Sequence, residues 1–174
     1  MISTDSKNKI NWRLISFHFS ATLFIILAVK QFAFLNDLGI LKSVDKYGHD
    51  LELKHLSAEG IVPNRLVFFS LWIKLSTSIG LVISFLISLN LTLRKKNHWL
   101  NSVLPLVATL FLSLFGVFDS NFVSKIFFSV GELVLPFGLK YNFILNGIIL
   151  CSIGIFLFFS RWASRIVFDK QTKE

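Results

Sequence analysis

The sequence predicts an all-α fold, a polytopic membrane protein in which four transmembrane helices form a bundle within a single domain, residues 1–174. Three observations support this prediction. Of the 174 residues, 53% are hydrophobic and only 16% are charged, whereas soluble domains carry about 25% charged residues. The apolar residues form long blocks that lack the alternation typical of membrane-barrel strands. The 20 phenylalanines also exceed what a soluble domain of this size would bury.

Four apolar blocks are long enough to cross a bilayer, which takes about 20 mostly apolar residues per helix. The first block is expected to be a retained helix rather than a secretory signal, because Lys30 and Gln31 occupy the place of a small-residue cleavage site. The expected spans are residues 14–35, 66–93, 99–118 and 141–160, and residues 36–65 form the first outer connection.

The distribution of charge predicts how these helices are threaded. More than half of the 18 lysine and arginine residues lie before the first span, in the 94–98 loop, or after the fourth span. Cytoplasmic flanks are enriched in Lys and Arg, and tryptophan collects at membrane interfaces, as expected here for Trp12, Trp99 and Trp162. We therefore expect a multi-pass protein of the bacterial inner membrane with both termini in the cytoplasm. Topology explains the net charge of +8 without a nucleic-acid partner.

The connection between the third and fourth spans contains an amphipathic stretch. We expect an interfacial helix over 122–139, lying in the membrane surface. A re-entrant segment and a fifth span are the alternatives, but a fifth span would bury two charged side chains and place the basic tail outside. The apolar residues that recur at helical spacing are Phe122, Ile126, Val130, Leu133 and Phe137.

The 36–65 connection is polar and contains several carboxylates and histidines. Such side chains can ligate zinc, but this stretch has no close pair of the H-E-x-x-H kind. We therefore expect a solvated cap with no metal site and no cofactor. The residues concerned are Asp45, His49, Asp50, Glu52, His55 and Glu59.

Lys74 interrupts the second apolar block and allows two interpretations. Measured from Leu66 at 1.5 Å per residue, it lies about 12 Å along the helix, near the bilayer centre, where a lysine costs at least about 2.5 kcal/mol and marks a functional site. However, the uncharged run from Leu75 to Leu93 is long enough to span alone. Lys74 is then an interface anchor beside Trp72, with its amine reaching water. We favour this second interpretation.

Polar residues recur at a similar depth in all four helices and form a candidate ligand-binding site. Lys30 lies near the outer end of the first span and Asp119 at the outer end of the third, while Asn142 and Asn146 lie one turn apart in the fourth. Together with Lys74 they predict either an internal polar network or an anion-binding site open to the outside. Asp119 is the expected charge partner of one lysine.

Small residues at every fourth position predict close helix packing, because they let helix backbones approach. Packing within the bundle is the expected role, and contact with another copy or subunit is the alternative. His18, about two turns into the first span, is expected to be a hydrogen-bonded packing residue rather than a proton relay. The small residues expected at helix contacts are Ser76, Gly80, Ser84 and Ser88 in the second span, and Gly147 and Gly154 in the fourth.

The sequence contains none of the catalytic motifs that carry a recognisable mechanism, so no catalytic residue is predicted. We expect a non-catalytic subunit, scaffold, sensor or accessory factor that assembles in the lipid bilayer, as a homo-oligomer or with a membrane protein partner. One alternative is a small oligomeric channel or transporter with an outer site lined by Lys30 and Lys74. A second alternative is a membrane-embedded enzyme for a lipid-linked substrate, using Asp119, Glu132, His49 or His55.

Overall fold

The computed structural model describes residues 10–47, 57–95, 97–119 and 138–159. Within these ranges the chain is helical and contains no strand. Three segments are long and apolar enough to cross a membrane, namely Trp12–Ser43, Pro63–Arg94 and Lys140–Phe159. Helices of this length and composition indicate an integral membrane protein. The prediction of an all-helical membrane protein is confirmed to this extent.

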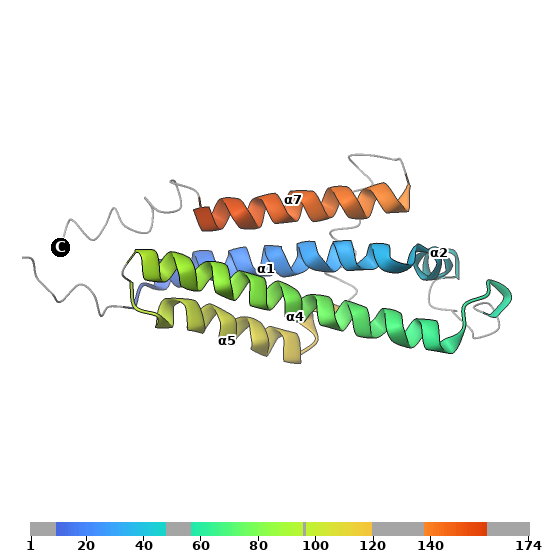
Figure 1. Cartoon of the computed structure of the whole chain (residues 1–174), viewed down its shortest axis with the longest axis horizontal. Coiled ribbons are helices and arrows are strands. Elements are labelled where there is room, and N and C mark those ends of the chain that lie inside the picture. Colours follow the sequence, from blue (N-terminus) through green and yellow to red (C-terminus); the bar gives the residue numbers. More distant parts are fainter. Residues whose placement is uncertain (1–9, 48–56, 96, 120–137, 160–174) are drawn as a thin grey trace, which may run out of the picture.

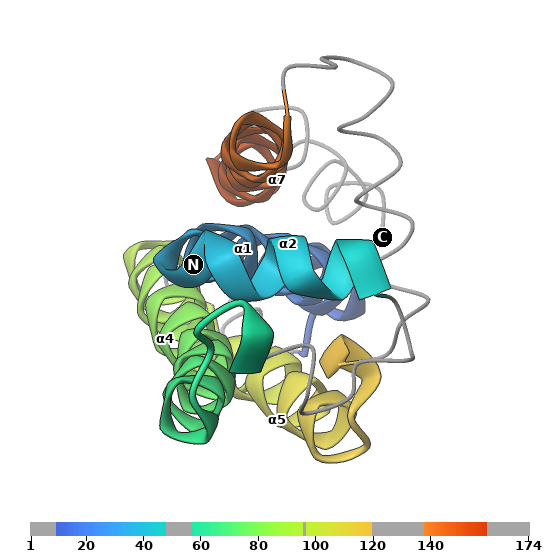
Figure 2. The same ribbon diagram turned by 90° about the vertical axis from the view of Figure 1, so that its right-hand side faces the viewer.

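The helix α1 (Trp12–Phe34) lies at the centre of the fold. Figure 2 shows α7 (Leu139–Phe159) on one side of α1, and α4 (Pro63–Arg94) and α5 (Leu100–Leu114) on the other. α1 packs against all three helices, whereas α4 and α7 touch only slightly. The described helices are therefore arranged in three layers, with α1 as the middle layer.

The described helices run side by side with alternating direction (Figure 1). At one end, here called the Trp12 end, α1 and α5 begin and α4 and α7 finish. At the other end, here called the α2 end, α1 continues through the 3-10 helix η2 (Leu35–Asp37) into α2 (Leu38–Tyr47). Any side chain can therefore be assigned to one of these two ends or to the middle of the fold.

Both sides of α1 are apolar and buried, as its central position requires. Ala21 and Ile25 form one core cluster with Phe158 of α7. Ile26 forms a second cluster with Leu81 of α4 and Phe118, which follows α5. Because α1 has packing partners on opposite sides, it lacks the single apolar stripe of a surface helix.

The α2 end is held by polar contacts that the sequence analysis did not anticipate. Asp37 Oδ1 accepts hydrogen bonds from the backbone N–H groups of Gly39 (3.1 Å) and Ile40 (3.2 Å), which caps the start of α2. The same carboxylate is paired with Arg65 of α4, at 2.7 Å from Nη2 and 2.5 Å from Nε. Ile40 itself packs against Ile61. Part of the expected 36–65 cap is thus a helix that lies across the end of α1 (Figure 2).

α5 is shorter than the expected 99–118 span, because it ends at Leu114. Gly116 follows with a φ of 67°, a left-handed conformation that favours glycine and commonly ends a helix. The chain then forms the 3-10 helix η3 (Val117–Asp119). Of the expected interfacial helix at 122–139, all but the last two residues lie outside the described residues.

Candidate functional site: buried polar side chains along α1

His18 joins three helices near the Trp12 end. Its side chain is 3% exposed, and Nδ1 lies 2.7 Å from the hydroxyl of Ser88 on α4. On the opposite side the imidazole packs against Phe158 of α7, with ring centroids 5.4 Å apart and planes tilted by 60°. The hydrogen bond and the ring contact together place His18 where it holds α4 and α7 against α1, as expected for a packing residue.

Further polar contacts at the Trp12 end connect α5 to its neighbours. The hydroxyls of Thr92 on α4 and Ser102 on α5 lie 2.7 Å apart and are fully buried. Asn101 Oδ1 accepts a hydrogen bond of 3.0 Å from the backbone N–H of Asn11, the residue that caps α1. The sequence analysis did not predict these contacts. The position of the polar residues near the ends of apolar blocks could have indicated them.

Near the α2 end, Lys30 is buried inside the fold. Its side chain is 6% exposed, and its amine donates a hydrogen bond to the backbone carbonyl oxygen of Phe118 in η3. The bond ties the segment after α5 to α1. A buried ammonium group needs such acceptors, because its desolvation otherwise costs several kcal/mol. The side chain of Asp119, the predicted charge partner, lies outside the described part of the structure, so that pairing stays a prediction.

Three buried amide side chains lie at the same end as Lys30. Gln31 follows it on α1, and Asn142 and Asn146 lie in the first two turns of α7; their exposed fractions are 6%, 5% and 3%. The antiparallel packing of the two helices brings these stretches together, since Phe34 contacts Phe143 with ring centroids 5.3 Å apart. Gln31 Oε1 and Asn142 Oδ1 have no hydrogen-bond partner among the described residues. The side chains of Gln31 and Asn142 therefore lie inside the fold, which the interpretation as an internal polar network requires.

Lys74 is placed differently from Lys30. It lies on the exposed surface of α4, while the neighbouring Ser76 and Thr77 are buried. Lys74 lies eleven residues after Pro63, where the 32-residue α4 begins, so its role as an interface anchor stays a prediction. The structure therefore puts one predicted lysine inside the fold and the other on its surface, and it does not bring them into one common site.

The predicted small residues lie at contacts between helices. A Cβ atom on Gly80 would come within 2.8 Å of Ile26 Cα on α1. On α7, a Cβ atom on Gly147 would come within 2.7 Å of the Phe32 ring of α1, and a Cβ atom on Gly154 would come within 2.8 Å of the Ile25 side chain. Three serines of the α4 stripe are almost fully buried, namely Ser76, Ser84 and Ser88.

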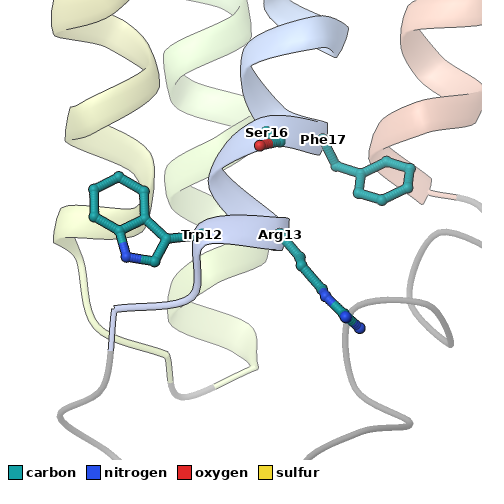
Figure 3. A pocket seen from close by; sticks show the side chains of 4 residues that line it. All are labelled: Trp12, Arg13, Ser16 and Phe17. Carbon is teal, nitrogen blue, oxygen red and sulfur yellow. The ribbon is translucent and has the colours of Figure 1, made fainter.

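An open hollow of about 480 Å³ lies on the surface at the Trp12 end. Among the described residues it is lined by Trp12, Arg13, Ser16 and Phe17, from the first two turns of α1. Figure 3 shows Arg13 and Phe17 extending to one side and Trp12 to the other, with Ser16 between them. The sequence analysis identified Trp12 as an interface residue but did not predict the hollow.

These polar groups are suited to holding helices together, because the side-chain hydrogen bonds of His18, Lys30, Thr92 and Asn101 each join two different helices or the segments that flank them. Among the described residues, no group of three His, Cys, Asp or Glu side chains is positioned to hold a metal ion. The outer-loop histidines His49 and His55 and the acidic Glu132 lie outside the described residues. Comparisons with protein families, curated proteins and solved structures gave no significant match.

Proposed function

We propose that the chain is a non-catalytic integral membrane protein that works as an assembling subunit, scaffold or accessory factor. What supports the non-catalytic assignment is the use of the buried polar groups. His18, Lys30, Thr92 and Asn101 each bond across a contact between helices or their flanking segments. Such bonds stabilise helix association inside a bilayer.

The proposal includes four crossings of a bacterial inner membrane with both termini in the cytoplasm. In this topology α5 and η3 together make the third crossing, and the interfacial helix follows. The sequence supports this orientation, because more than half of the Lys and Arg residues lie before the first span, in the 94–98 loop or after the fourth span, and cytoplasmic flanks are rich in these residues. Among the described residues, exposed Lys and Arg side chains occur at both ends of the fold.

The observation that carries the assembly proposal is the low burial of α4. In the 18-residue apolar window of α4, 22% of the residues are buried. The corresponding windows in Trp12–Ser43 and Lys140–Phe159 are 44% and 39% buried. α4 is nevertheless 32 residues long. It therefore offers more free surface to a neighbouring protein than the other two candidate spans.

The small-residue stripe of α4 packs against α1, so a partner has to use another face. That face contains an apolar groove of about 230 Å³ between α4 and α5. In lipid, apolar surface alone does not drive association, and close shape matching is required. We propose that a helix of a second copy of this chain seats its side chains there. The groove is lined by Ser78, Leu81, Val82 and Phe85 of α4 and by Leu106 and Leu110 of α5.

A tryptophan placed in the groove tests this proposal. Ser78→Trp fills the space between the helices, whereas Ile83→Trp puts the same side chain on exposed α4 surface outside the groove and serves as the matched control. The mass of the detergent-solubilised protein, measured by light scattering, should show oligomers for the wild type and for Ile83→Trp, and monomers for Ser78→Trp. A wild type that is strictly monomeric and retains no partner during purification would overturn the proposal.

The channel or transporter alternative has less support, because its two lysines occupy different environments: Lys30 is buried and Lys74 is exposed. A site that needs both amines would have to bring them together. Ion or solute flux through liposomes containing the protein, compared with a Lys30→Ala, Lys74→Ala double variant, decides between the two functions. Flux that the double variant abolishes would favour the alternative.

A further inference from the structure

The hollow at the start of α1 combines charged, hydroxyl and aromatic side chains at one end of an apolar helix. Arg13, Ser16 and Trp12 are exposed, and Phe17 is half-buried. The backbone N–H groups of Arg13 and Leu14 are already occupied, because Asn11 Oδ1 accepts hydrogen bonds of 3.1 Å from both. Recognition of a ligand therefore falls mainly to the side chains.

We propose that this hollow binds the headgroup of an anionic phospholipid, a site that goes beyond the assembly function. The guanidinium of Arg13 is suited to the lipid phosphate, since its planar fork matches phosphate oxygens. The Ser16 hydroxyl supplies a further donor one turn along the helix. Trp12 sits at headgroup level, where tryptophans collect, and Phe17 lies deeper, beside the first part of an acyl chain. The volume of about 480 Å³ is within the usual range for ligand sites, about 300–1,000 Å³.

Charge complementarity favours an anionic lipid over a zwitterionic one. The same end of the fold exposes Arg94 and Lys95 in addition to Arg13. Each cationic residue near an anionic membrane surface adds about 1 kcal/mol of attraction, or about a fivefold change in affinity. The combined electrostatic field of these cationic side chains would attract anionic lipids even without a defined site. The experiment therefore has to distinguish the effect of Arg13 from that of the other charges.

The test compares the full-length protein with two variants that lose the same charge. Native mass spectrometry from mixed micelles measures the affinity for phosphatidylglycerol and for phosphatidylcholine. The wild type should prefer phosphatidylglycerol, Arg13→Gln should weaken that binding by about fivefold or more, and Arg94→Gln should weaken it clearly less. Equal losses in the two variants would show a diffuse charge effect and overturn the site. Displacement of the lipid by millimolar inorganic phosphate would also overturn it, because the site would then bind free phosphate.

A second measurement locates the lipid without changing the charge. In a variant that keeps Trp12 and replaces Trp72, Trp99 and Trp162 by Phe, fluorescence reports only on the hollow. Phosphatidylglycerol with brominated acyl chains should quench this fluorescence more strongly than brominated phosphatidylcholine at the same concentration. Phe17→Ala should reduce the difference, whereas Phe159→Ala, at the same end of the fold on α7, should leave it unchanged. Equal quenching by the two lipids would contradict the proposal.

Discussion

Replacing Gly80 by alanine tests how tightly α4 packs against α1. A Cβ atom at this position lies 2.8 Å from Ile26 Cα, which is about 0.6 Å closer than the 3.4 Å at which ordinary contact begins. Because the nearest atom belongs to the backbone of α1, the clash is relieved only when one helix moves away from the other. Overpacking of this kind costs about 1–3 kcal/mol.

The same substitution at Gly147 provides the matched comparison. There the nearest atoms, at 2.7 Å, belong to the far side of the Phe32 ring. Phe32 is 39% exposed, so its ring can turn outward with little loss of packing. Alanine also favours the helix by about 0.8–1.0 kcal/mol relative to glycine. After this gain is subtracted from the cost of overpacking, we expect Gly80→Ala to lower the free energy of unfolding by about 1 kcal/mol, and Gly147→Ala to leave it unchanged or raise it slightly.

Unfolding of the two variants in mixed micelles, driven by increasing SDS and followed by circular dichroism, measures this difference. The wild type and both variants need the same micelle composition, because helix association in detergent depends on it. A Gly80→Ala protein as stable as the wild type, or a greater loss for Gly147→Ala than for Gly80→Ala, would refute the reasoning about backbone contact.

Three further predictions follow from the described contacts. An amine-reactive reagent, read out by mass spectrometry, should modify Lys74 in the folded protein and spare Lys30, which is 6% exposed, until the protein is unfolded; equal reaction of both would contradict the placement. A double-mutant cycle with His18→Phe and Ser88→Ala should give a coupling free energy of about 0.6 kcal/mol and no more than about 1.7; a value of zero would show that their 2.7 Å contact adds nothing. Asp37→Ala removes the cap of α2 and should speed hydrogen exchange in Leu38–Tyr47 but not in α7; unchanged exchange in α2 would mean that the cap is dispensable.

The positions of the long apolar helices could be predicted from the sequence because lipid imposes a simple rule on their length and composition. α1, α4 and α7 begin and end within three residues of the spans expected at 14–35, 66–93 and 141–160. The stripe of small residues on α4 also indicated which side of that helix faces a neighbour, since helix backbones approach closely only where side chains are small.

The end of α5 and the presence of α2 were not anticipated, although both have local signals. Gly116 marks the end of α5 through its left-handed φ of 67°, but its apolar neighbours extended the expected span past it. Asp37 is a helix-capping residue, but the polar composition of 36–65 suggested a loop. In both places a single residue determines where a helix begins or ends. Hydropathy averaged over the surrounding residues does not detect such a residue.

Which buried polar groups meet could not be deduced from one chain. The predicted layer at the α2 end contains Lys30 and Asn142 as expected, but the acceptor observed for the Lys30 amine is the backbone carbonyl of Phe118. Every residue has such a carbonyl, so no sequence pattern distinguishes this one. The pairing depends on where η3 lies relative to α1, and that is a property of the packed helices.

The central position of α1 has a consequence for biogenesis. α1 leaves the ribosome before the helices that surround it, yet it carries His18, Lys30 and Gln31, whose buried surroundings come from later parts of the chain. During synthesis these polar side chains face lipid or the insertion machinery until α4, η3 and α7 arrive. The nascent α1 is thus retained in the bilayer by its apolar residues, and its polar groups gain their final neighbours only after α7 has been synthesised.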